Sequence, residues 1–267
     1  MDVLEKLGKF YSEFDGEKGY IGWTEKGKPI PYLHIGNKKA PCILAQYGIH
    51  AREYITTYLA LEQIKLLQNK KLNGSIYFIP AVNLDGIEIA LKDKPLYKAN
   101  ANGVDLNVNF DARWGKGKSN VFIKGDENYV GAYPFSEKES QALRDFTLKV
   151  MPDLTLSYHS KGQEIYWYFF QHGDTLKRDY FLAKVIEKST GYKIKKTPDS
   201  CGGYKDWCIE KLNIPSFTLE VGKDSLIHPI KEIHLKEILS ENEKVFLDLI
   251  KELNKSEYEK QIYDDGL

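Results

Sequence analysis

Three polar residues of this sequence have the types and the spacing of a catalytic metal site. His50 and Glu53 lie three residues apart, directly after the apolar run 41–47, so their side chains can share one face of the next turn. His159 follows a second apolar run, 153–158. Two imidazoles and one carboxylate, with a fourth position left for water, are the ligands of catalytic rather than structural zinc. Taken singly, a His-x-x-Glu pair is common on helices, and His159 would fit a core histidine bonded to backbone.

A fourth polar residue favours the metal interpretation. Glu220 lies near the end of the apolar run 216–221, and a carboxylate among apolar neighbours is costly unless it faces a polar site. Hydrolysis at zinc requires a base that takes a proton from water, and a Glu outside the metal ligands is a usual candidate. We therefore expect Glu220 to lie near the other three side chains.

The elements that must position these residues alternate between strands and helices. The predicted strands cover 41–47, 75–80, 153–158, 164–170 and 216–221. The predicted helices cover 53–69, a stretch after a capping box of Ser136 and Glu139, 180–190, 205–211 and 235–253. An Asn- and Gly-rich segment, 83–131, is predicted to be a long loop region. The alternation indicates an α/β fold with a mainly parallel sheet and helices on both faces, and ligands of such sheets bind beyond the carboxyl ends of the strands.

Composition excludes several other classes of protein. The chain has 267 residues, with 38 Lys and Arg against 38 Asp and Glu. Zero net charge disfavours binding to nucleic acid or to anionic membranes. No apolar run approaches the roughly 18 residues of a membrane span, and the amino terminus lacks a leader pattern. Cys42, Cys201 and Cys208 are odd in number, so free thiols are expected. We expect one catalytic domain over residues 1–267, kept in the cytosol, with neither nucleic acid nor membrane as partner.

Six short segments, in order between about residues 40 and 222, carry a resemblance to a known family. They are 48–54, 80–86, 103–107, 134–137, 158–160 and 217–220. In these segments the sequence resembles the zinc carboxypeptidases of the carboxypeptidase A superfamily. The resemblance implies one zinc ion per chain, held by His50, Glu53 and His159, with Glu220 as general base and acid. It also implies an eight-stranded mixed sheet flanked by helices.

The sequence departs from this family where relatives bind the terminal carboxylate of the substrate. Relatives carry an Arg directly after the residue that matches Asn107, whereas Val108 stands there in this chain. Arg113 lies close by in sequence and could replace that Arg, because a guanidinium matches a carboxylate in two-pronged geometry. Arg113 would equally fit an ordinary surface cation.

Two further departures concern groups that assist the reaction. Lys98 stands where many relatives carry the Arg that stabilises the oxyanion. A lysine keeps the positive charge of that Arg but lacks the two-pronged hydrogen-bonding geometry of its guanidinium. Arg52 is a second candidate for stabilising that charge. Pro198 falls at the position of the mobile Tyr of the family, and Tyr204 is the nearest phenol that could take its place.

Within the superfamily, segments 97–107 and 203–207 most resemble the bacterial branch that cleaves γ-D-glutamyl bonds to meso-diaminopimelate in peptidoglycan peptides. Lys205 then lines the pocket for the residue after the scissile bond, where a cation suits a substrate carboxylate, although a solvated helix residue is the simpler interpretation. The sequence thus predicts a zinc metallocarboxypeptidase that acts on muropeptides inside the cell. Two alternatives stay open: a zinc N-acyl-amino-acid hydrolase, and a binding module that holds peptidoglycan fragments without cutting them. The sequence does not predict the oligomeric state or whether cleavage is exo or endo.

Overall fold

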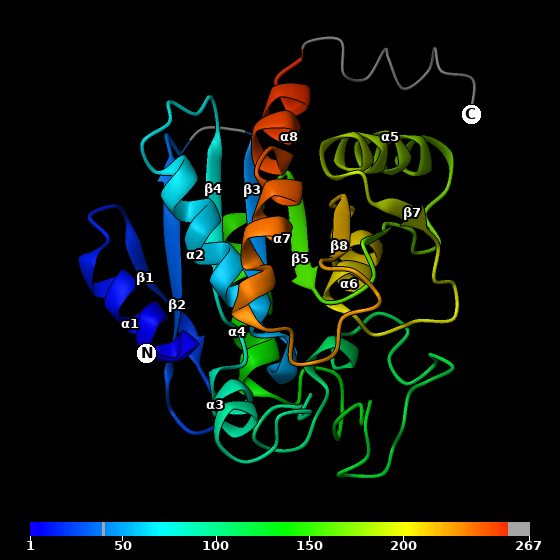
Figure 1. The fold of residues 1–267 in the computed structure, drawn as a ribbon. Helices are drawn as coiled ribbons and strands as arrows, with labels where there is room; N and C mark the ends of the chain where they lie inside the picture. The colour runs from blue at the N-terminus through cyan, green and yellow to red at the C-terminus, as the bar shows by residue number, and fades with distance from the viewer. Residues whose placement is uncertain (39–40, 256–267) are drawn as a thin grey trace.

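The computed structural model describes residues 1–38 and 41–255, and its strands form one eight-stranded sheet (Figure 1). The strands, in chain order, are β1 (Lys18–Trp23), β2 (Pro29–Gly36), β3 (Cys42–Tyr47), β4 (Ser75–Ile79), β5 (Leu154–His159), β6 (Glu164–Tyr166), β7 (Lys193–Lys195) and β8 (Ser216–Glu220). Their order across the sheet is β1-β2-β4-β3-β5-β8-β6-β7. The central strands β4, β3, β5 and β8 run parallel, and antiparallel pairs occur toward the two edges. This confirms the predicted α/β fold with a mixed, mostly parallel sheet.

Helices cover both faces of the sheet. The α-helices are α1 (Val3–Glu13), α2 (Ile55–Leu67), α3 (Leu84–Lys92), α4 (Lys138–Val150), α5 (Gly173–Thr190), α6 (Tyr204–Leu212), α7 (Leu235–Asn242) and α8 (Val245–Leu253). Three short 3-10 helices are η1 (Ala51–Glu53), η2 (Leu106–Val108) and η3 (Glu232–His234). One apolar core lies against α1, α2, α5, α7 and α8, whereas a second core lies against α4 and α6.

Alternation along the central strands decides which side chains reach the site. Tyr47 and Tyr158 point into the first core, where their rings stack with centroids 4.6 Å apart. His159 follows Tyr158 in β5, so its side chain points to the opposite face, on the side of α4 and α6. The β5 and β8 strands pair in parallel with His159 opposite Glu220. The register therefore brings both polar residues to one face at the carboxyl end of the sheet.

Several predicted boundaries are wrong, and side-chain hydrogen bonds to the backbone explain two of them. The predicted strand 164–170 ends at Tyr166, because the Gln171 side chain accepts a hydrogen bond from Phe169 N and donates one to Trp167 O. The predicted helix 235–253 divides into α7 and α8, and at that point the Gln63 amide donates to the carbonyl of Asn242.

Other differences lie in segments where the hydrophobic periodicity of the sequence is weak. Helix α3 lies inside the predicted loop region 83–131, and the Asn83 side chain caps it by accepting a hydrogen bond from Gly86 N. Ser136 does not cap α4: its hydroxyl donates to Glu137, which is the N-cap residue. Helix α5 begins at Gly173 rather than near 180. The elements α1, β1, β2 and β7 were not predicted.

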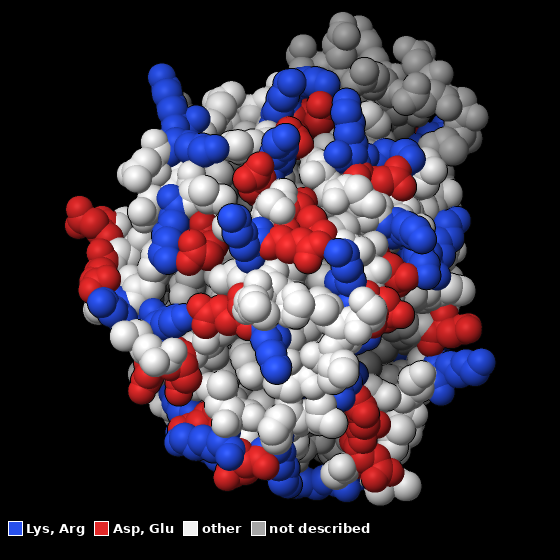
Figure 2. Space-filling view, in the orientation of Figure 1, with Lys and Arg blue, Asp and Glu red and all other residues white. Residues whose placement is uncertain are grey.

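Charges of both signs mix on one face of the molecule, and the free thiols that the sequence predicts are confirmed. Over the described residues of the face in Figure 2, basic and acidic side chains are interspersed, without a broad area of one sign. No helix in the described part of the chain is long and apolar enough to cross a membrane. Cys42, Cys201 and Cys208 are free thiols.

Candidate metal centre

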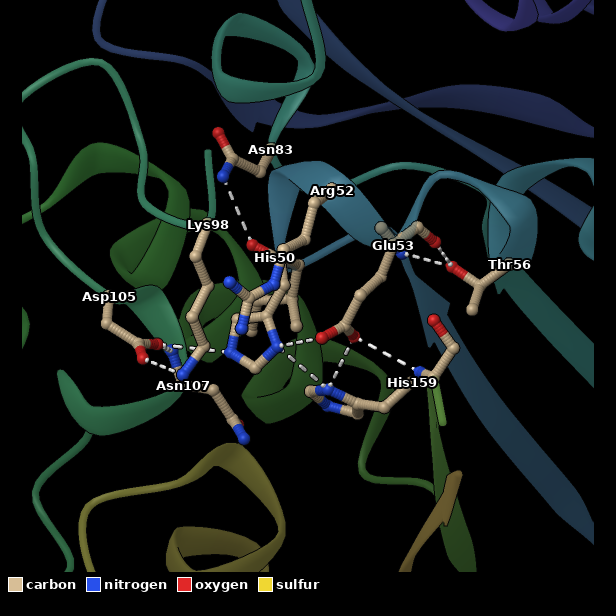
Figure 3. A network of polar contacts seen from close by, with 12 residues as sticks. His50, Arg52, Glu53, Thr56, Asn83, Lys98, Asp105, Asn107 and His159 are labelled. Atoms are coloured by element: carbon tan, nitrogen blue, oxygen red, sulfur yellow. Dashed lines mark hydrogen bonds and ion pairs between the residues drawn. The ribbon is translucent and has the colours of Figure 1, made fainter. Parts of the chain in front are cut away.

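The two predicted histidines and Glu53 meet at the carboxyl end of the central strands (Figure 3). His50 precedes the 3-10 helix η1, which turns the chain from β3 into α2 and ends at Glu53. His50 Nδ1 lies 2.9 Å from Glu53 Oε1 and 3.2 Å from His159 Nδ1, and His159 Nδ1 lies 3.2 Å from Glu53 Oε2. All three side chains are buried. Their ligand atoms lie within 4.8 Å of one another, so the group could hold a metal ion.

The spacing and the charge of this group fit a divalent cation. Ligands about 2.0–2.1 Å from a tetrahedral zinc ion are about 3.3 Å apart, close to the separations seen between these atoms. Burial alone would lower the pKa of His50, but the carboxylates of Glu53 and Asp105 raise it to about 9. The site thus favours positive charge between two imidazoles and a carboxylate. A bound zinc ion would supply that charge with both histidines neutral.

A chain of polar contacts fixes the His50 ring through its Nε2 atom, on the side away from Glu53 and His159. His50 Nε2 lies 3.1 Å from Asp105 Oδ1, and Asp105 Oδ2 pairs with Lys98 Nζ at 2.7 Å. Lys98 also donates to Asn128 Oδ1 at 2.7 Å. Burial would raise the pKa of Asp105, but Lys98 and His50 hold it far below its usual range. A carboxylate that receives the far N–H of a ligating imidazole fixes the ring and its tautomer, so Asp105 is a positioning residue for His50.

The other histidine stands in a different setting. His159 Nε2 and the Ser160 hydroxyl are buried and have no hydrogen-bond partner within the described residues. Burial lowers the pKa of His159, which keeps the imidazole neutral as a metal ligand requires. Ser160 N donates to Glu53 Oε2 at 3.2 Å and so helps to orient that carboxylate.

Glu220 lies beside this second half of the group. It is opposite His159 in the β5–β8 register, and their side chains share one face. Burial and the charge of Glu53 raise the pKa of Glu220 well above its usual range, against the opposing effect of His50 and Lys98. A carboxyl group with a raised pKa next to a metal-binding group can take up and return a proton.

A cleft of about 440 Å³ opens beside His50. Its lining includes the predicted residues Lys98 and Asn107, together with Val108 and Asp105. Arg52 does not line this cleft; its guanidinium donates to Glu127 at 2.7 Å and to Leu96 O at 3.4 Å.

Two predicted substrate contacts, Tyr204 and Arg113, have other partners. Tyr204 is fully buried and its hydroxyl forms a 2.8 Å hydrogen bond with Thr147 on α4, which corrects the expectation that this phenol could reach substrate. Arg113 bonds Glu210 and packs its guanidinium 3.4 Å from the centre of the Phe170 ring, and it is not among the residues that line the cleft.

Lys205 is buried, and the carboxylate of Asp206 balances its positive charge. Its Nζ lies 2.5 Å from Asp206 Oδ1 and donates to Tyr168 O at 3.1 Å. Asp206 in turn accepts from Gly203 N at the start of α6. Lys205 therefore belongs to the start of the helix, and it is not among the residues that line the cleft, so its contact with substrate stays a prediction.

Sequence reasoning missed four residues around the centre. The motif 103–107 predicts a role for Asn107 alone, although Asp105 is the residue that contacts His50. Asn128, Lys118 and Lys196 also line the cleft. They lie in irregular segments, where no periodicity indicates which side chains converge.

Comparison with known proteins shows the family to which the chain belongs. A family model described as zinc carboxypeptidase matches residues 16–244. The chain belongs to the zinc carboxypeptidase family. Family members hydrolyse peptide bonds, so the chain belongs to a family of peptide-bond hydrolases. The resemblance that the six short segments carry is thus confirmed.

Among curated relatives, gamma-D-glutamyl-L-diamino acid endopeptidase 1 of Lysinibacillus sphaericus is 30% identical over 271 residues, covering 87% of this chain and 66% of the relative. Human carboxypeptidase O is 29% identical, covering 76% of this chain and 63% of the relative. The chain thus spans less than two thirds of the length of these relatives.

Solved structures show the same fold. Bovine thrombin-activatable fibrinolysis inhibitor, in complex with tick carboxypeptidase inhibitor, superposes with a TM-score of 0.81 at 22% identity, covering 95% of this chain and 97% of that one. Murein-tripeptide amidase from Escherichia coli O157 has a TM-score of 0.65 at 21% identity, with 90% and 93% covered. At these identities the likeness concerns the fold.

Proposed function

We propose that this protein is a zinc-dependent peptidase that hydrolyses the γ-D-glutamyl bond to a diamino acid in cell-wall peptides. One observation carries the proposal: the buried group of His50, Glu53 and His159 lies beside Glu220, at a cleft, in a member of the zinc carboxypeptidase family. These are the ligand set and the base that metal-assisted hydrolysis requires.

His50, Glu53 and His159 would hold one zinc ion per chain. When bound, zinc polarises the scissile carbonyl and lowers the pKa of water. Asp105 keeps the His50 ring oriented with its Nδ1 toward the site. Glu220 takes the proton from the attacking water and returns it to the leaving amine, which its raised pKa favours.

Cations near the site would stabilise negative charge that develops on the carbonyl oxygen. Lys98 lines the cleft next to His50, and its ammonium is held by Asp105 and Asn128. We assign Lys98 this role, with Arg52 as a more distant contributor. Asn107 also lines the cleft and would hydrogen-bond the substrate.

The substrate class rests on the curated relative and on local charge. The relative from Lysinibacillus sphaericus is named for cleavage between γ-D-glutamate and an L-diamino acid, and it covers most of this chain. Diaminopimelate carries carboxylate and amine at its far end. The cleft beside His50 is lined by Lys98, Lys118 and Lys196, whose positive charges suit a substrate that carries carboxylates.

A hydrolysis panel tests the proposal. Purified protein with one equivalent of zinc is incubated with L-Ala-γ-D-Glu-meso-diaminopimelate, with the α-linked L-Glu isomer and with N-acetylated amino acids, and products are identified by mass spectrometry. We expect free diaminopimelate from the first peptide, and its loss with a chelator. Cleavage of only the N-acetylated amino acids would favour the N-acyl-amino-acid hydrolase. Tight binding of the tripeptide without any product would favour the binding module.

A further inference from the structure

Two lysines that line the cleft, Lys118 and Lys196, have no carboxylate partner among the residues that the structure describes. The charged residues of the lining are Lys98, Lys118, Lys196, Asp105 and Asp199, in addition to His50. Lys98 and Asp105 neutralise each other at 2.7 Å. Within the described residues, no ion pair joins Lys118 or Lys196 to any carboxylate. The cleft thus keeps two uncompensated ammonium groups against one further carboxylate, that of Asp199.

The aromatic segment after β6 shows how Lys196 differs from Lys205. Lys196 Nζ lies 5.3 Å from the centre of the Trp167 ring and 4.9 Å from that of Tyr168. Lys205 Nζ lies 5.4 Å from the centre of the Phe169 ring, but Asp206 neutralises it. Aromatic rings attract an ammonium group without removing its charge. Lys196 is therefore positioned by the rings and still able to bind an anion.

Lys118 comes to the same cleft from a distant segment. It lies in the irregular segment before α4, and its backbone N donates to Asp199 O at 2.9 Å. This bond ties the segment that carries Lys118 to the one that carries Lys196, so both lysines belong to one wall. Val108, which lines the cleft too, has no charge to contribute. With Lys98 paired to Asp105, the ammonium groups of this cleft that lack a carboxylate partner among the described residues come from the two tied segments.

We infer that Lys118 and Lys196 form a carboxylate-binding subsite that selects substrates with a free carboxylate on the leaving amino acid. This inference rests on the proposed function and specifies how the substrate is chosen. Ammonium groups attract a carboxylate as point charges and hydrogen-bond donors. The carboxylate has two sources in a leaving diaminopimelate, its α-carboxyl group and the carboxyl group at its far end.

Paired substrates and charge-neutral variants test the subsite. The substrates are the γ-D-Glu-diaminopimelate tripeptide and two analogues, each with one of the diaminopimelate carboxylates replaced by a carboxamide. The variants are Lys118→Gln, Lys196→Gln, their double, and Lys196→Arg, which keeps the charge. Lys116→Gln is the matched control, because Lys116 is exposed in the same segment and does not line the cleft. The readout is kcat and KM for each pair.

We expect each Lys→Gln change to raise KM for the free acid by about 3-fold to 5-fold, and the double to raise it by about 10-fold, with kcat nearly unchanged. For the analogue in which a carboxamide replaces the recognised carboxylate, KM should be the same in the Lys→Gln variants as in wild type. Comparison of the two analogues thereby identifies which carboxylate of diaminopimelate the lysines bind. Lys196→Arg and Lys116→Gln should behave as wild type, and the preference should weaken as salt rises.

A binding measurement removes any dependence on turnover. In a Glu220→Gln background, where substrate stays intact, calorimetry should show the double lysine variant binding the free acid about 10-fold more weakly, with binding of the carboxamide that lacks the recognised carboxylate unchanged. Equal losses for the acid and for both carboxamides would overturn the inference, and so would an unchanged acid preference in the double variant. If wild type cleaves acid and carboxamides equally well, the inference alone fails. If it cleaves none of them, the proposed function fails and the inference falls with it.

Discussion

The two histidines of the metal group have opposite surroundings. His50 Nε2 contacts Asp105, which pairs with Lys98, and Lys98 in turn donates a hydrogen bond to Asn128. His159 has a buried Nε2 without a hydrogen-bond partner among the described residues, and its neighbour on the next strand is Glu220. Both ring nitrogens of His50 thus have polar partners, whereas His159 Nε2 has none among the described residues.

This difference suggests a division of labour within one site. The contacts of His50 order its ring before any metal binds, because Asp105 is an acceptor fixed by Lys98. The side of His159 and Glu220 keeps polar atoms free, where water and a leaving amine exchange protons. Variants on the two sides should therefore differ in what they lose, metal affinity or turnover.

The largest effect should come from removing a ligand on either side. We expect His50→Ala and His159→Ala each to lose zinc on dialysis and to lose at least about 1000-fold in activity, because two ligands hold zinc poorly. Elemental analysis of the purified proteins measures the zinc. A His159→Ala protein that keeps one tightly bound zinc ion would contradict the ligand assignment.

The next effect separates turnover from metal binding. Glu220→Gln should lower kcat by about 100-fold to 10000-fold, because the amide cannot accept the proton, while zinc content stays at that of wild type. Steady-state kinetics on the tripeptide, combined with metal analysis of the same sample, gives both quantities. Near-normal kcat would remove Glu220 from the mechanism.

On the side of His50, the expected loss is in metal affinity. Asp105→Asn keeps the shape and removes the charge that orients the ring, so zinc should bind about 10-fold to 100-fold more weakly. Competition with a chromophoric chelator measures this dissociation constant. At saturating zinc, kcat should recover much of its wild-type value; an unchanged affinity would show that the contact with Asp105 is dispensable.

The smallest effect is expected next to His159. The Ser160 hydroxyl is buried without a hydrogen-bond partner in the described part of the chain. Ser160→Ala should therefore leave zinc affinity within about 2-fold, and the free energy of unfolding should stay the same or rise by about 1 kcal/mol. Chelator competition and denaturant titration test both. A 10-fold loss of affinity would show that the two sides do not differ as described.

The central strands could be predicted because they are buried on both faces. The strands within the runs 41–47, 153–158 and 216–221 are buried along almost their whole length, and the large apolar side chains in these runs are typical of strands covered by helices on each side. Strand β7 has an exposed, intermediate, exposed pattern, and β1 is at best half-buried along its length. Edge strands of this kind carry little apolar signal, which explains why sequence patterns missed them.

The same reasoning explains which site residues could be predicted. His50, His159 and Glu220 lie at or just after the ends of parallel strands, so the sheet itself brings them together. The positions of Tyr204 and Lys196 depend on helix rotation and on loop conformation, which no periodicity reports. Tyr204 accordingly turned inward toward Thr147, whereas Lys196 lines the cleft.

Zinc titration of metal-stripped protein tests the central claim most directly. Zinc is added in fractions of an equivalent to wild type and to Glu220→Gln, while bound zinc and hydrolysis of the γ-D-glutamyl-diaminopimelate tripeptide are followed together. The account predicts that both proteins bind one equivalent, that the wild-type rate rises linearly until that point, and that Glu220→Gln stays near background. Full activity of the stripped wild type, or no hydrolysis at one bound equivalent, would contradict it.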